Sequence, residues 1–201
     1  MIFAHAFIGM IIAFAYESVY RGKGVFSNPR QKMALWTSAI LGSIFPDFDI
    51  LYPIFINTQA DHRELLTHSM IPYLFVLALI IGGSRLHQYT KIQASVIAVF
   101  FIGILFHLIG DSFVDKVYLF KPFSNFSFQF EHSQIDKNKG FLGYFHSSFM
   151  LAESMISLLG FGLFIKSFAN FHKQFRLLLS FIAIIEAGVF IALLPFLYSF
   201  N

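Results

Sequence analysis

Histidine and aspartate residues gather in four short stretches of a chain that is otherwise apolar. These stretches contain His5, then Pro46-Asp47-Phe48-Asp49, then His62-Arg63 with Thr67-His68-Ser69, and finally His107 with Asp111. Imidazole and carboxylate groups together are ligands of divalent metals such as zinc, manganese and iron. The chain contains no cysteine, which excludes thiolate ligands and a cysteine nucleophile. The four stretches therefore predict a site for one or two divalent ions held by nitrogen and oxygen.

The spacing within two of the stretches supports this interpretation. His107 and Asp111 are four residues apart, so on a helix they share one face, with Cβ atoms about 6 Å apart. The alternative is a helix-end aspartate beside a satisfied histidine, but ionisable groups at the edge of an apolar span are costly and usually functional. Asp47 and Asp49 repel each other unless a cation lies between them. A helix stop after Pro46 explains this pair equally well.

Five further side chains complete the candidate site. His68 lies at the expected start of a helix and is a better-placed ligand than His62, which lies on the loop side. Arg63 has the planar group that binds phosphate, although an interfacial anchor would look the same. Glu153 is a candidate ligand or general base. His5 alone would be a weak candidate, and it gains weight from the position of the other groups.

The composition indicates the environment in which this chain folds. Of its 201 residues, 57% are hydrophobic and 12% are charged, and the mean hydropathy is +0.69. These values are typical of an integral membrane protein rather than a soluble domain. The net charge of +3 comes from scattered residues, without the dense basic run that nucleic-acid binding would need. The lipid bilayer is therefore the expected partner, and nucleic acid is not.

The apolar segments predict an all-α, polytopic fold in a single domain, residues 1–201. A membrane span needs about 17 to 25 apolar residues. Six segments approach or reach this length, which predicts about six transmembrane helices. The expected spans are residues 2–16, 34–52, 66–83, 94–110, 149–165 and 177–198.

The positive residues predict the orientation of these spans. Nine of the 14 Lys and Arg residues fall on one side of the membrane and five on the other, so the first side is expected to be cytoplasmic. His5, the aspartate pair, His68 and the pair His107 and Asp111 then all lie at the outward face. The long connection 111–148 is outward as well. The sequence thus predicts one constellation at one membrane face.

The order of these motifs resembles the YdjM-type inner-membrane proteins over roughly the first 124 residues. The resemblance rests on His5, Pro-Asp-x-Asp at 46–49, His-Arg…Thr-His-Ser at 62–69, His-x-x-x-Asp at 107–111, and Pro122-Phe123-Ser124. It implies a membrane-bound metal-dependent hydrolase of the bacterial inner membrane, and an association with the LexA repressor. The third block departs from the family pattern, because Glu64-Leu65-Leu66 is one residue longer and lacks a glycine. The resemblance therefore supports a ligand role for His68 more strongly than for His62.

The motifs leave three functions open. The leading hypothesis is a hydrolase that cleaves a phosphoester of a lipid or lipid-linked substrate with metal-activated water, zinc being the first choice and manganese or iron the alternatives. The motif from His107 to Asp111 also looks like the His-x-x-x-Asp of zinc phospholipases C and related nucleases. The second hypothesis is a structural or regulatory protein whose metal clamps helix ends. A metal transporter comes third, because such sites usually lie at the midplane between repeats.

Overall fold

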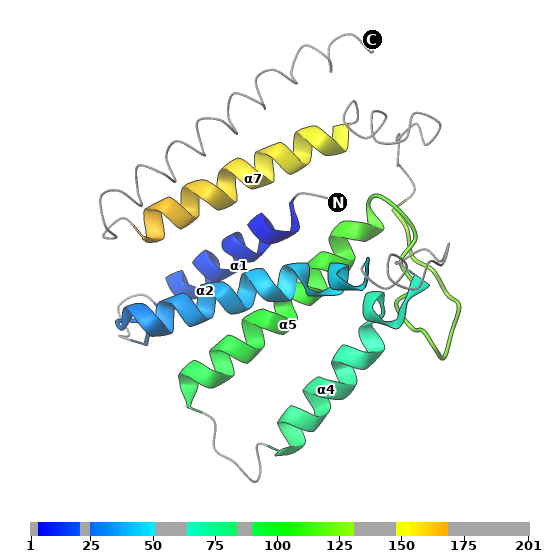
Figure 1. Ribbon diagram of the computed structural model, residues 1–201, viewed down its shortest axis with the longest axis horizontal. Coiled ribbons are helices and arrows are strands. Elements are labelled where there is room, and N and C mark those ends of the chain that lie inside the picture. The colour runs from blue at the N-terminus through cyan, green and yellow to red at the C-terminus, as the bar shows by residue number, and fades with distance from the viewer. Residues whose placement is uncertain (1–3, 21–24, 51–63, 84–89, 131–147, 169–201) are drawn as a thin grey trace.

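The computed structural model describes residues 4–20, 25–50, 64–83, 90–130 and 148–168, and the regular structure in these ranges is helical, without a β-strand. The α-helices are α1 (His5–Val19), α2 (Pro29–Ile44), α4 (Met70–Gly83), α5 (Lys91–Ser112) and α7 (Ser148–Ser167), and two 3-10 turns are η1 (Phe45–Ile50) and η3 (Leu66–His68). Helices α1, α2 and α5 pack together, α7 lies along α1, and α4 diverges from α5 (Figure 1). The predicted all-α fold is confirmed for the described residues.

Polar caps explain why two helices begin earlier than the apolar segments do. The side chain of Asn28 accepts a hydrogen bond from the Arg30 N–H at the start of α2, and Pro29 occupies the first helical position. Thr90 and Gln93 form a reciprocal capping box at the start of α5. Hydropathy detects only the apolar part of each helix, so the expected starts at 34 and 94 fall inside α2 and α5.

The ends of two helices differ from the expected spans, and both differences concern the candidate site. Helix α2 ends at Ile44, and the chain continues as the η1 turn, where Pro46 lacks the N–H that would extend the helix. Helix α4 begins at Met70, after the η3 turn that contains His68. Asp47 and His68 therefore lie in short turns outside the apolar helices. The expected span 177–198 lies outside the described residues.

Two of the described helices, Lys91–Ser112 and Phe149–Ser167, are long and apolar enough to cross a membrane. Helices α1 and α4 are apolar but shorter. Helix α4 buries none of its residues, and Phe75 and Leu79 are 64% and 60% exposed. In a membrane protein, such a surface is covered by lipid. The six-span topology stays a prediction.

Helices α2 and α5 approach each other closely at two glycines. A Cβ atom on Gly42 would lie 2.1 Å from the carbonyl oxygen of Phe100, and a Cβ atom on Gly103 would lie 2.7 Å from the backbone nitrogen of Ser43. Small residues at a helix crossing permit this backbone approach. The crossing places the Ser43 carbonyl beside His107, which lies one turn beyond Gly103 on α5.

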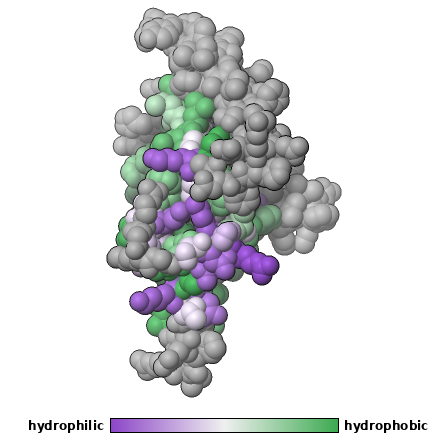
Figure 2. Space-filling view, turned by 90° about the vertical axis from the view of Figure 1, so that its left-hand side faces the viewer, coloured by the Kyte–Doolittle hydropathy of each residue, from purple (hydrophilic) through white to green (hydrophobic). Residues whose placement is uncertain are grey.

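The end of the bundle away from the histidines is held by Glu17. Its carboxylate accepts hydrogen bonds from the Trp36 indole at 2.9 Å and the Ser167 hydroxyl at 2.7 Å, and it lies 2.9 Å from the Lys32 ammonium. These contacts join α1, α2 and α7. Figure 2 looks at this end of the molecule, where hydrophilic side chains gather between apolar flanks.

Candidate metal centre

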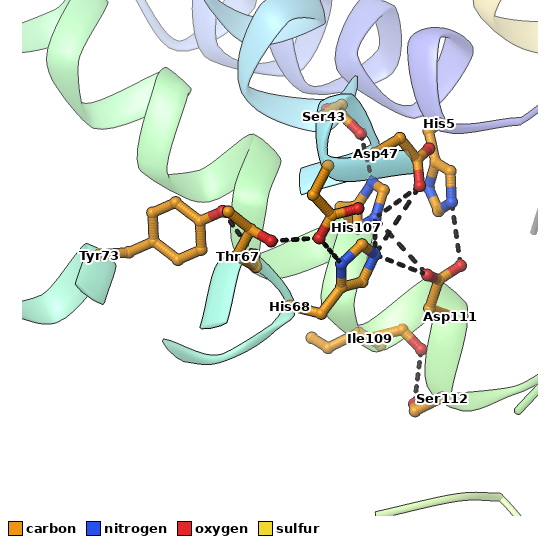
Figure 3. A network of polar contacts seen from close by, with 11 residues as sticks. His5, Ser43, Asp47, Thr67, His68, Tyr73, His107, Ile109, Asp111 and Ser112 are labelled. Atoms are coloured by element: carbon orange, nitrogen blue, oxygen red, sulfur yellow. Dashed lines mark hydrogen bonds and ion pairs between the residues drawn. The ribbon is translucent and has the colours of Figure 1, made fainter. Parts of the chain in front are cut away.

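Five side chains from four separate elements converge at the other end of the bundle (Figure 3). His5 comes from the start of α1, Asp47 from η1, His68 from η3, and His107 and Asp111 from the last turns of α5. The sequence predicted all five as metal ligands, although 106 positions separate the first from the last. The structure brings ligand atoms of four of them within 4.8 Å of one another, and His68 lies beside this group, with its Nε2 3.5 Å from Asp111 and from His107.

His107 is oriented by the backbone of α2. Its Nδ1–H donates to the carbonyl oxygen of Ser43 at 2.7 Å. Because a carbonyl oxygen only accepts, Nδ1 carries the proton, and the Nε2 of the neutral ring presents a lone pair. This Nε2 lies 3.5 Å from the Nε2 of His68. No side-chain motif reveals Ser43, because the backbone supplies the contact and the close helix crossing positions it.

His68 is oriented by a carboxylate in the same way. Its Nδ1–H donates to Oδ2 of Asp49 at 2.8 Å. The hydroxyl of Thr67 donates to the same oxygen, and the Tyr73 hydroxyl donates to the Thr67 carbonyl. A carboxylate behind a histidine fixes the ring and raises the basicity of the opposite nitrogen in metal sites. Asp49, predicted as a ligand, is thus placed behind His68 rather than among the converging atoms.

Asp111 lies between the three imidazoles. Its Oδ1 is 3.1 Å from the Nε2 of His5, and its Oδ2 is 3.5 Å from the Nε2 of His68 and 3.6 Å from that of His107. The His5 ring also stacks on the His107 ring, with centroids 3.8 Å apart. The i,i+4 spacing of His107 and Asp111 on α5 produces the neighbouring pair that the sequence predicted.

The cluster is buried except on one side. The side chains of His68 and His107 are fully buried, and those of His5 and Asp111 are 2% exposed. The Asp47 side chain is 37% exposed, and its Oδ1 lies 3.5 Å from His107 Nε2 and 3.8 Å from His68 Nε2. Asp47 therefore stands at the opening of the cluster. A metal site that reacts with a substrate needs such an open side.

The charged groups of the cluster shift the pKa values of His68 in η3 and Asp47 in η1. Burial lowers the pKa of His68, but its hydrogen bonds with Asp111, Asp47 and Asp49 outweigh burial and raise that pKa to about 10. Burial raises the pKa of Asp47, but the hydrogen bond with His68 and the charges of His107 and His5 hold it below its ordinary value. Both shifts favour a positive charge among the carboxylates. In the protein without metal, a proton on His68 supplies that charge.

The donor set fits a divalent cation. One ligand atom from each of His5, Asp47, His107 and Asp111 lies within 4.8 Å of the others, and these residues can hold a metal ion. His68 adds a further nitrogen within 3.8 Å of Asp47. With both Nδ1 atoms engaged as donors, two imidazole lone pairs and two carboxylates face the same space, which is unfavourable without a cation. Nitrogen and oxygen donors of this kind suit zinc, manganese or iron.

The remaining predicted site residues are His62, Arg63 and Glu153. His62 and Arg63 are outside the described residues. Glu153 is buried in α7, 1% exposed, and is not one of the four residues whose ligand atoms lie within 4.8 Å of one another. Tyr73 was missed by sequence analysis, because a tyrosine within an apolar helix gives no sign of its link to Asp49 through Thr67.

The segment that follows α5 returns over the end of that helix. Val117 and Phe128 exchange two backbone hydrogen bonds of 2.9 Å each. The Ser69 hydroxyl donates to the Leu119 carbonyl at 2.9 Å, which ties this segment to the junction of η3 and α4. Within the predicted outward connection 111–148, the described segment that follows α5, residues 113–130, is thus anchored next to the histidine cluster.

Comparison with known proteins identifies the family of this chain. The family model described as "YdjM inner membrane protein" matches residues 1–193. Neither the curated proteins nor the solved structures contain a match. The matched region includes every residue of the cluster and all the described helices. This chain therefore belongs to the YdjM family of inner membrane proteins.

Proposed function

We propose that this protein is a metal-dependent hydrolase that cleaves a phosphoester of a lipid or lipid-linked substrate at the outer face of the inner membrane. One observation carries the proposal: three imidazoles and two carboxylates converge in a chain that is mostly apolar. Ionisable groups in such a setting are costly and are kept for function. Their donor types match those of hydrolytic metal sites.

The residues of the cluster have separate roles in this proposal. A divalent ion bound here would acidify a water molecule and neutralise charge on a phosphate. His107 and His68 would hold the ion through Nε2, because Ser43 and Asp49 fix their opposite nitrogens. Asp111 would neutralise the ion's charge at the centre of the set. Asp47 marks the exposed side, where the phosphoester would approach.

Two further roles in the proposal come from the sequence alone. Arg63 would bind the phosphate through its planar guanidinium group. Glu153 would act as an additional ligand or as a general base. The outward orientation of the cluster follows from the distribution of Lys and Arg.

The proposal is tested by following hydrolysis of phosphoesters by the purified full-length protein with added zinc or manganese. A soluble aryl phosphate and a long-chain alkyl phosphate provide two substrates with the same reacting group. We expect turnover by the wild type and its loss in Asp111→Asn. Asp115→Asn is the matched control, because Asp115 lies four residues further on and accepts a hydrogen bond from the Lys116 N–H. Full activity in Asp111→Asn would contradict the proposal.

Nearly complete burial of four ligands favours a second candidate, a structural metal clamp. His5, His68, His107 and Asp111 connect α1, η3 and α5, and a metal among them would hold the helix ends together. Under this alternative, chelation unfolds the protein, while no phosphoester is hydrolysed at any metal loading. Metal-dependent turnover by the folded protein decides for the hydrolase.

A further inference from the structure

Four ligand atoms of the cluster are nearly equidistant from one another. They are the Nε2 atoms of His68 and His107, the Oδ1 atom of Asp47 and the Oδ2 atom of Asp111 (Figure 3). The two nitrogens lie 3.5 Å apart, and each lies 3.5–3.8 Å from both carboxylate oxygens. Five of the six distances among these atoms thus fall in one narrow range, and the four atoms form a tetrahedral set.

The distances within the tetrahedral set match those around a zinc ion. Zinc binds histidine nitrogen and carboxylate oxygen at about 2.1 Å, so neighbouring ligands of a regular tetrahedron lie about 3.4 Å apart. Neighbouring ligands of an octahedral ion with bonds of about 2.1 Å lie only about 3.0 Å apart. The observed distances are slightly longer than the tetrahedral value and clearly longer than the octahedral one. They therefore favour zinc, which prefers tetrahedral ligands, over manganese, which prefers octahedral ones.

The ring of His5 lies beside the tetrahedral set and is turned away from its centre. One of its nitrogens is within 4.8 Å of ligand atoms of Asp47, His107 and Asp111. However, the His5 ring stacks on the His107 ring, with centroids 3.8 Å apart and planes inclined by 24°. An imidazole nitrogen binds a metal through a lone pair in the plane of its ring. An ion in the plane of the His107 ring therefore lies outside the plane of the His5 ring.

His5 instead holds the second oxygen of Asp111. Its Nε2–H donates to Oδ1 of Asp111 at 3.1 Å, while Oδ2 of the same carboxylate faces His68 and His107. Because a carboxylate only accepts, this Nε2 carries the proton and has no lone pair for a metal. A hydrogen bond of this kind fixes the direction of a carboxylate and leaves its other oxygen to bind an ion.

We propose that a zinc ion is bound by the tetrahedral set, and that His5 is a positioning residue that holds Asp111 from outside this set. The proposal rests on the metal-binding part of the proposed function, and it specifies the metal and its ligands. His5 then supports Asp111 in the same way that Asp49 supports His68. Asp47 is the exposed member of the set, which makes it the ligand that an approaching substrate meets first.

X-ray absorption at the zinc edge counts the imidazole ligands directly and requires no turnover. The full-length protein is loaded with zinc in phosphatidylcholine nanodiscs, and the wild type is compared with His5→Ala and His5→Gln. We expect four nitrogen and oxygen ligands in the wild type, two of them imidazoles, and the same count in both variants. A third imidazole in the wild type would overturn the tetrahedral set, and its loss in His5→Ala would identify His5 as a ligand.

Zinc affinity of the same variants tests the hydrogen bond from His5 to Asp111. We expect His5→Ala to bind zinc about 10- to 100-fold more weakly, the usual effect of removing a group that orients a ligand. In His5→Gln the amide still donates to Asp111, so this variant should recover most of the loss. Glu17→Gln is the control, because Glu17 lies near the far end of the same helix and contacts Trp36 there. Equal losses in both His5 variants would contradict the positioning role.

Cobalt in place of zinc reports the geometry and separates this proposal from the hydrolase function. Tetrahedral cobalt(II) absorbs visible light much more strongly than octahedral cobalt(II), so we expect intense bands in the wild type and in His5→Gln. Weak octahedral bands, together with metal-dependent hydrolysis, would overturn this proposal and leave the hydrolase standing. Intense bands and two imidazoles, in a protein that hydrolyses neither phosphoester, would refute the hydrolase and support the tetrahedral site.

Discussion

The Nε2 atoms of His68 and His107 lie 3.5 Å apart, and each ring donates its opposite N–H to an acceptor behind it. The carboxylate of Asp49 holds one ring, and the Ser43 carbonyl holds the other. Two nitrogen lone pairs aimed at one space, with Asp111 and Asp47 beside them, need a positive charge between them. A bound divalent metal would provide that charge, and a proton on His68 provides it when no metal is bound.

Metal affinity should increase with pH. The pKa of His68 is raised to about 10 in the protein without metal, so at neutral pH a metal must displace its proton. Asp47, whose pKa is lowered, stays ionised and adds no pH dependence near neutrality. We expect affinity to rise about tenfold per pH unit between about pH 6 and 9, with release of about one proton. Titration against a chelating dye at several pH values measures this slope, and a flat profile would refute the competition.

Removal of the carboxylate behind His68 should weaken the site without abolishing it. Groups that orient metal-binding histidines typically contribute about 10- to 100-fold in affinity. We expect Asp49→Asn to lose zinc affinity in this range. Glu64→Gln is a suitable control, because the Glu64 side chain is 53% exposed and pairs with Lys121, which lies outside the cluster. Unchanged affinity in Asp49→Asn would show that Asp49 does not support His68.

The glycine crossing should be essential to both the fold and the site. In Gly42→Ala the new Cβ atom would meet the Phe100 carbonyl oxygen at 2.1 Å, so the helices must separate. We expect a lower unfolding temperature together with weaker zinc binding, because the Ser43 carbonyl moves away from His107. Gly82→Ala has open space around its Cβ position and should gain about 0.5–1 kcal/mol from helix propensity. If both variants behave alike, the crossing does not position the site.

The Glu17 contacts should contribute to stability but not to chemistry. Glu17→Ala leaves the buried Trp36 indole without its acceptor, at a cost of about 1–3 kcal/mol, and removes the carboxylate beside Lys32, whose ammonium keeps its hydrogen bond to the Ser167 carbonyl. Glu17→Gln keeps an acceptor and should lose less. Thermal unfolding measures the difference, and zinc affinity below the unfolding temperature should match the wild type in both variants. A loss of zinc in the folded Glu17→Ala protein would contradict this separation.

The sequence revealed ligand types better than it revealed local geometry. His107 and Asp111 were predictable as neighbours because a four-residue spacing on a helix fixes their relation. The place of Asp49 was not predictable, because a 3-10 turn replaces the helix from Phe45 onward and turns the carboxylates of Asp47 and Asp49 in different directions. Ser43 left no signal, since its carbonyl acts through a helix crossing that depends on Gly42 and Gly103.

The helix boundaries were likewise predictable only in part. The apolar core of α5 was evident from hydropathy, while its polar first turn is set by the capping box of Thr90 and Gln93. The start of α4 was expected at Leu66, but the η3 turn precedes the helix and takes His68 out of it. Hydropathy measures transfer to lipid, and it carries little information about caps and turns.

Elemental analysis of the purified full-length protein tests the central claim most directly. The account predicts one or two equivalents of a divalent transition metal in the wild type, and their loss in His107→Ala while the protein remains folded. Asp115→Asn should keep the wild-type content. A folded wild-type protein that retains no stoichiometric metal, even after incubation with zinc, manganese or iron, would contradict the account.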